Sequence, residues 1–69
     1  MNSISRIVTF IEQHKNAFAV SRLIMLSGVQ VRRYTAETDE DAVATERVLE
    51  AARGMLTEAE YADLKKQLA

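Results

Sequence analysis

The first third of the chain carries an apolar pattern with the period of an α-helix. Four apolar side chains follow the spacing i, i+3, i+4, i+7: Ile4, Ile7, Val8 and Ile11. This spacing puts them on one face of a helix, with polar residues on the other. The hydroxyl of Ser3 can accept a hydrogen bond from an amide of the first turn. We therefore expect an amphipathic helix that begins at Ser3.

The polar run His-Lys-Asn at positions 14–16 leaves two interpretations open. It suits a helix end, because basic side chains are favourable near the negative C-terminal pole. A lone histidine such as His14 is then a capping group rather than a metal ligand. Alternatively the helix continues, since apolar residues recur every seven positions from Ile4 to Met25. Residues 3–27 thus form either one helix or two.

Residues 17–26 are apolar on nearly every side, because only Ser21 and Arg22 interrupt them. A helix of this kind is usually buried on every side. A chain of 69 residues has little core to bury it in, and small chains without cross-links often gain stability by oligomerising. We therefore predict a homodimer. Its expected interface residues are Phe18, Val20, Met25 and Leu26.

Gly28 is expected to end this segment, because glycine reaches a positive φ without steric cost. The residues that follow, VQVRRYTA at 29–36, fit an extended segment as well as a short helix. An apolar helix, a glycine turn and an exposed basic element form the outline of a helix-turn-helix. The bulky Ile24 and the polar Ser27 fit that motif poorly.

The second half of the chain begins with the polar run TAETDED at 35–41. Thr38 and Asp41 approximate a capping box, which predicts a helix over 39–53. A calcium loop is disfavoured, because the run lacks the turn glycine and the distal glutamate that such a loop requires. Gly54 is expected to end this helix in the same way as Gly28, at a positive φ.

The last helix has the clearest start signal. Thr57-Glu58-Ala59-Glu60 is a complete capping box, and the helix is expected to run to about Gln67 with Lys65 and Lys66 near its end. Together these patterns predict one all-α domain over residues 1–69. We expect a small bundle of three to four helices.

The amino-acid composition argues against several classes of protein. The chain has no cysteine and one histidine, so neither a disulfide framework nor a zinc site is expected. No apolar run approaches the ~20 residues that span a bilayer, and no secretory leader is recognisable at the start. We expect a cytoplasmic protein that does not bind a membrane.

The two halves of the chain differ in charge. Residues 1–35 carry five basic residues and one acidic residue, whereas residues 36–69 carry four basic and nine acidic residues. Such an asymmetry suggests an anionic partner for the first half. Attraction between the two halves explains it equally well.

No catalytic pattern is present. A chain of this length seldom encloses a pocket, and it has neither a cysteine nucleophile nor a glycine loop for phosphates. We expect no enzymatic activity, no cofactor, no metal and no small-molecule substrate.

The leading functional hypothesis is a dimeric, DNA-binding transcriptional regulator of the bacterial or phage type. The side chains expected to contact duplex DNA are Arg22, Gln30, Arg32, Arg33 and Tyr34. The alternative is a helical module that inhibits or masks a protein partner through the same surface. Its apolar patch would comprise Phe10, Phe18, Val20, Met25 and Leu26. A continuous basic stripe would favour DNA, and arginines paired with neighbouring carboxylates would favour the protein partner.

Overall fold

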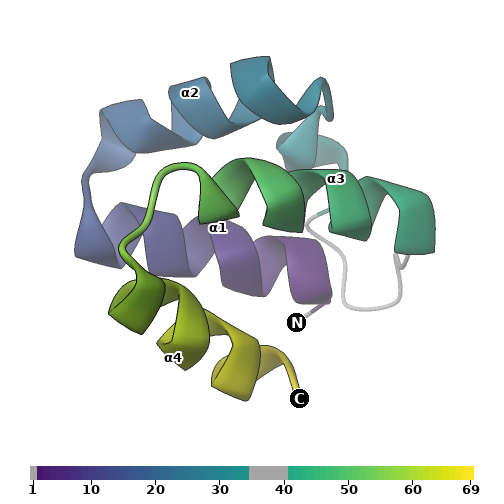
Figure 1. Ribbon diagram of the computed structural model, residues 1–69. Helices are drawn as coiled ribbons and strands as arrows, with labels where there is room; N and C mark the ends of the chain where they lie inside the picture. Colours follow the sequence, from purple (N-terminus) through teal and green to yellow (C-terminus); the bar gives the residue numbers. More distant parts are fainter. Residues whose placement is uncertain (1, 35–40) are drawn as a thin grey trace.

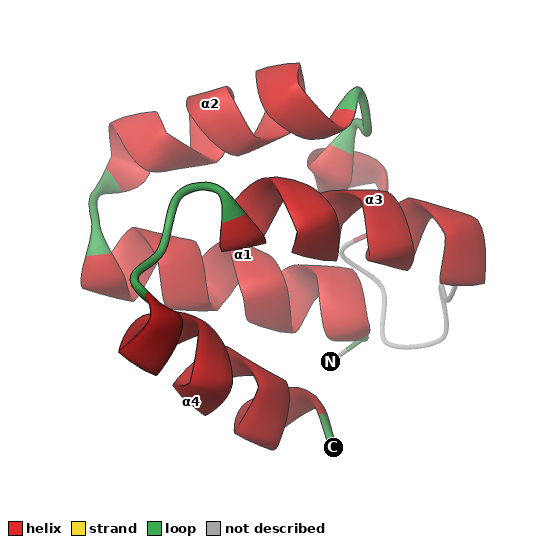
Figure 2. Ribbon diagram, viewed as in Figure 1, coloured by secondary structure: helices red, strands yellow, loops and turns green. Residues whose placement is uncertain are grey.

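The computed structural model describes residues 2–34 and 41–69, and these residues form helices joined by short turns (Figures 1 and 2). The elements in chain order are α1 (Ser3–His14), α2 (Ala17–Ser27), the 3-10 helix η1 (Val31–Tyr34), α3 (Ala42–Arg53) and α4 (Glu58–Leu68). The predicted all-α bundle is therefore confirmed.

Helix α1 is the centre of the bundle, because it contacts α2, η1, α3 and α4. In Figure 1, α2 and α4 lie on opposite sides of α1, and α3 packs along it. The apolar stripe predicted for α1 is confirmed, since Ile4, Ile7 and Ile11 are at most 1% exposed. The other helices add a few apolar side chains each to the same core: Leu23 from α2, Val48 and Ala52 from α3, and Leu64 from α4.

The N-cap of helix α1 lies one residue earlier than predicted. Asn2, rather than Ser3, is the N-cap, and its side-chain oxygen accepts a hydrogen bond of 2.8 Å from the amide of Ser5. The Asn2 side-chain nitrogen also donates to the carbonyl of Tyr34 at 2.6 Å, and the Ser5 hydroxyl donates to the same carbonyl at 2.8 Å. Asparagine can do both because its amide is donor and acceptor. The start of α1 is thus joined to the end of η1.

The polar run at 14–16 separates two helices, which settles the question left open by the sequence. Asn16 caps α2 through a side-chain bond of 3.1 Å from the amide of Ala19. The His14 ring nitrogen Nδ1 lies 2.9 Å from the carbonyl oxygen of Phe10, in the last turn of α1. The chain reverses here, so α2 runs back along α1 (Figure 1).

The two glycines differ in backbone conformation. Gly28 has a φ of 69°, and its amide donates to the carbonyl of Ile24 at 2.9 Å, so it ends α2 as expected. Gly54 has a φ of −70° and lies in the ordinary helical region. The expectation of a positive φ at Gly54 is wrong. Its turn is a helical one, in which the amide of Met55 donates to the carbonyl of Ala52 at 3.0 Å, so no left-handed residue is needed.

Side-chain caps also fix the starts of the last two helices. Helix α3 begins at Ala42, and Asp41 caps it by accepting from the amides of Val43 and Ala44 at 3.1 Å. The predicted start at residue 39 and the Thr38 cap lie outside the described residues. The capping box of α4 is confirmed, because the hydroxyl of Thr57 accepts from the amide of Glu60 and the Glu60 carboxylate accepts from the amide of Thr57.

Candidate interaction surface

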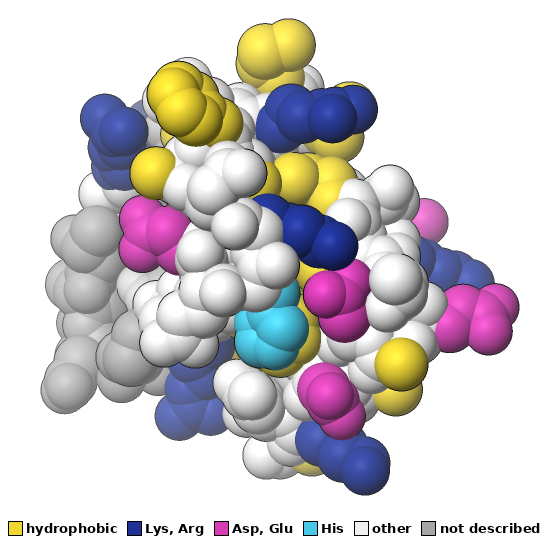
Figure 3. All heavy atoms as spheres, turned by 90° about the vertical axis from the view of Figure 1, so that its left-hand side faces the viewer, with side chains coloured by type: hydrophobic (Ala, Val, Ile, Leu, Met, Phe, Trp, Pro, Cys, Tyr) yellow, Lys and Arg dark blue, Asp and Glu magenta, His cyan; other side chains and the backbone are white. Residues whose placement is uncertain are grey.

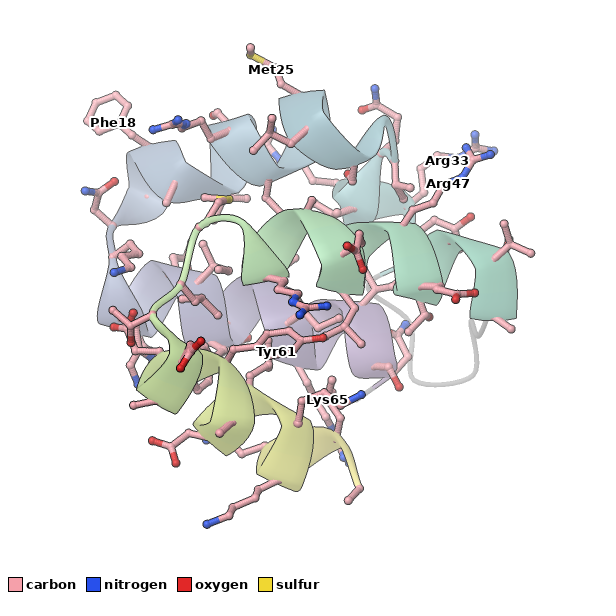
Figure 4. All side chains as sticks on the ribbon, in the orientation of Figure 1. Phe18, Met25, Arg33, Arg47, Tyr61 and Lys65 are labelled. Atoms are coloured by element: carbon pink, nitrogen blue, oxygen red, sulfur yellow. The ribbon has the colours of Figure 1, made fainter. Side chains whose placement is uncertain are left out.

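Helix α2 exposes large apolar side chains on one face. Phe18 is 86% exposed, Met25 79% and Leu26 58%. At positions i, i+7 and i+8 these residues share a face of the helix, and the exposed Arg22 at i+4 lies between them. We call Phe18, Arg22, Met25 and Leu26 the α2 face. Figure 4 shows Phe18 and Met25 pointing away from the bundle, and Figure 3 shows hydrophobic and basic side chains side by side at the top of the molecule.

Two residues of the predicted apolar patch belong to the core instead. Val20 is 8% exposed and Phe10 is 1% exposed, so neither is available at a surface. Val20 follows Phe18 by two positions, which places it about 200° further around the helix and therefore on the inward side. Within a single chain only the inward side of α2 is buried, so the expected covering of its outer side depends on another molecule.

Two open, adjoining depressions lie between α2 and the α3 side of the bundle, next to the α2 face, and we call them together the groove. Its first part, of about 440 Å³, is lined by Phe18, Leu26 and Met55 together with Lys15 and Arg22. Its second part, of about 490 Å³, is lined by Arg47, Glu50, Ala51 and others. The two parts meet at Leu26 and Gly54, which line both. The groove therefore extends the apolar surface of α2 towards α3.

Two of the five basic residues in the first half bind within the chain. The ammonium of Lys15 lies 3.0 Å from the carboxylate of Glu60 in α4. The guanidinium of Arg6 donates to the carbonyl of Gln67 at 3.3 Å. The hydrogen bond from the backbone amide of Thr57, followed by the bond to Lys15, lowers the pKa of Glu60 below its ordinary value. Of these two contacts, only Lys15–Glu60 pairs opposite charges from the two halves of the chain, because Arg6 contacts a neutral carbonyl.

The residues predicted to bind DNA do not form one continuous stripe. Arg22 lines the groove beside α2. Arg32 lines a separate cleft of about 340 Å³ between α1 and α2, which also holds Glu12. Arg33 and Gln30 line a third cleft, of about 310 Å³, near the start of α3.

The third cleft contains one basic residue that the sequence did not indicate. Arg47 lines it together with Arg33, and Figure 4 shows both side chains extending in the same direction. The two residues are far apart in sequence, and the fold brings them together at a cleft that residues of both η1 and α3 line. Asp41 lines the same cleft and carries the opposite charge.

Tyr34 makes contacts that join η1 to its neighbours. Its side chain is half-buried, its carbonyl accepts the bonds from Asn2 and Ser5, and its hydroxyl donates to the Asp41 carboxylate at 3.4 Å. η1 itself is a single four-residue turn. Between Gly28 and Tyr34, the described chain therefore holds no α-helix that would act as the recognition helix of a helix-turn-helix.

Within residues 2–34 and 41–69, no helix has the length and apolar character needed to cross a bilayer. The same residues bring together no cluster of three or more histidine, aspartate or glutamate side chains able to hold a metal ion. Neither a protein-family model, nor a curated protein, nor a solved structure matches this chain.

Proposed function

We propose that this protein is a non-enzymatic helical module that binds another protein chain through the α2 face and the adjoining groove. The observation that supports this most is the exposure of Phe18, Met25 and Leu26 on one side of one helix. Contiguous exposed apolar side chains mark interaction sites in small soluble domains. Aromatic residues and arginine are also the side chains that contribute most to protein interfaces, and Phe18 with Arg22 supplies both.

The free energy available from the α2 face indicates that the groove also takes part in binding. Burying the exposed parts of Phe18, Met25 and Leu26 in an interface contributes about 3–7 kcal/mol to the free energy of binding. Association costs about 4–15 kcal/mol in lost freedom of motion. The α2 face alone therefore gives at best weak binding. A partner that also fills the groove at Met55 and Ala51 buries further apolar surface, which adds to the free energy of binding.

The homodimer predicted from the sequence would use this same face, since three of its four expected interface residues, Phe18, Met25 and Leu26, are exposed there. Self-association and partner binding through α2 then exclude each other. The homodimer is therefore the competing occupant of this face, and the same substitutions as for partner binding test it.

Binding of duplex DNA is the second candidate, and the pairing of Arg33 with Arg47 in one cleft is the observation that favours it. Two neighbouring guanidinium groups suit a phosphate. Asp41 in the same cleft repels a phosphate, and Arg22 and Arg32 lie elsewhere, so fewer basic groups would act together than the sequence suggested. If both arginines contact phosphates, the double variant Arg33→Ala/Arg47→Ala flattens the salt dependence of a gel shift by about two units. Absence of any duplex binding at low salt would rule this candidate out.

The protein-binding proposal is tested by selecting displayed helical peptides on the immobilised chain. Val43 provides a matched control, because it is 63% exposed but lies on α3 rather than α2. We expect Phe18→Ser to lose the selected peptides and Val43→Ser to retain them, with both variants keeping the helical circular dichroism of the wild type. Equal retention by both variants would contradict binding through α2.

A further inference from the structure

We infer that the partner segment is an amphipathic helix that presents a carboxylate to Arg22, with apolar side chains about one turn before and after it. This inference rests on the proposed function and specifies the chemistry of the partner. It follows from where Arg22 lies on α2 and from what surrounds it.

Arg22 occupies the middle of the α2 face. At about 100° per residue, it lies about 40° around the helix from Phe18 and about 40° from Leu26, on the arc between them. Along the helix axis it is also midway between the two. A partner that covers both Phe18 and Leu26 therefore also covers the guanidinium group of Arg22.

Covering Arg22 requires an acceptor, because arginine stays charged under all ordinary conditions. Burying it against apolar atoms would leave an unpaired charge, which costs several kcal/mol. Helix α2, AFAVSRLIMLS, contains no acidic residue. The ion pair formed by the described residues joins Lys15 to Glu60 and leaves Arg22 without a carboxylate. A partner carboxylate can accept two parallel hydrogen bonds from the guanidinium and so replace the water that is lost.

The charges along the groove point to the same kind of partner. Besides Arg22, the groove is lined by Arg47, by the carboxylate of Glu50, and by Lys15, whose charge is already paired with Glu60. Among the described lining residues the two arginines thus outnumber Glu50, although the chain as a whole has a net charge of −1. An apolar helix with acidic residues complements them, and helices of this type bind grooves through anchors spaced three, four and seven residues apart.

A second copy of the chain fits this surface less well. In a symmetric antiparallel contact of two α2 helices, Phe18 faces Leu26 of the other copy, and Arg22 then lies on the two-fold axis. Each Arg22 would face its own counterpart, with no acidic residue on α2 to separate the charges. Like charges placed opposite each other disfavour an interface.

The test is to select helical peptides from a display library on the wild type, on Arg22→Glu and on Arg22→Gln. We expect the wild type to enrich Asp or Glu between two apolar positions. Arg22→Glu should instead enrich Lys or Arg at that position, and should bind the best acidic peptide at least tenfold more weakly than the wild type does. Arg22→Gln should enrich neither charge.

The outcomes separate this inference from the proposed function. If Phe18→Ser loses all peptides but Arg22→Glu selects the same peptides as the wild type, the α2 face binds protein and the inferred carboxylate is wrong. If Phe18→Ser retains all peptides, the proposed function fails as well. Light scattering of the wild type at micromolar concentration should show a monomer. A dimer that Phe18→Ser dissociates would identify a second copy as the occupant and overturn the inference.

Discussion

Phe10 and Phe18 are eight positions apart on successive helices and have opposite surroundings. The ring of Phe10 is 1% exposed and stacks on the His14 ring with centroids 3.8 Å apart, whereas the ring of Phe18 is 86% exposed. Phe10 packs in the core, on the buried side of α1. Phe18 contributes little to that core and is free to contact another molecule.

This contrast predicts opposite effects on stability. Phe10→Ala should lower the free energy of unfolding by about 3–5 kcal/mol, through lost burial and the cavity left behind. Phe18→Ala should change it by no more than about 0.5 kcal/mol, as is usual for surface positions. Urea unfolding followed by circular dichroism measures both. A large, concentration-dependent loss for Phe18→Ala would show that Phe18 is covered in solution by another copy.

The two glycines should also respond differently to alanine. Gly28→Ala forces a residue with a Cβ into φ of 69° and should cost about 1–2 kcal/mol, although the added atom meets nothing within 4 Å. At Gly54 the backbone is helical, and a Cβ would lie 3.5 Å from the carbonyl oxygen of Ala51, which is an ordinary contact. Gly54→Ala should therefore be neutral or stabilise by up to about 1 kcal/mol. Thermal melts showing the reverse order would contradict these backbone conformations.

The N-caps of α4 and α1 should differ in how much they stabilise the fold. Thr57→Ala removes an exposed cap and should cost about 1 kcal/mol. Asn2→Ala removes a cap and also the hydrogen bond to the carbonyl of Tyr34, so it should cost about 2 kcal/mol. Differential scanning calorimetry would rank the two variants. A smaller loss for Asn2→Ala would argue against the junction between α1 and η1.

The ionisation of Glu60 makes the free energy of unfolding depend on pH, and its contribution is lost in acid. Its pKa in the folded chain lies below the ordinary value of 4.5, chiefly because of the Thr57 amide and then because of Lys15. The folded state therefore favours the carboxylate, and this contribution is present at neutral pH and lost as the pH falls below 4.5 through the lowered pKa. The melting temperatures of wild type and Glu60→Gln should differ at neutral pH and converge in acid. A difference that does not change with pH would refute this role.

The parts of the fold that were predictable from sequence are those set by local interactions. The stripe of α1, the helix end at Gly28 and the capping box at Thr57 each depend on residues within one or two turns of each other. The conformation of Gly54 was not predictable in this way, because it depends on the path the chain takes between α3 and α4. The residue type is compatible with either region of backbone space.

The candidate surface was only partly predictable for a related reason. When nearly every position of a helix is apolar, as in residues 17–26, the sequence does not show which side faces inward. Packing of α2 on α1 and α3 buries Val20 and exposes Phe18. The proximity of Arg33 to Arg47 likewise arises from tertiary packing, and the spacing of the two residues in the chain gives no sign of it.

Site-specific photocrosslinking in the cells that make the protein tests binding through the α2 face most directly. p-Benzoyl-phenylalanine at Phe18 changes the exposed aromatic ring little, and the same group at Gln13, an exposed polar position on α1, serves as the control. If the α2 face binds another protein, position 18 gives one main adduct to that protein and position 13 does not. No adduct at position 18, or the same adducts at both positions, would contradict it.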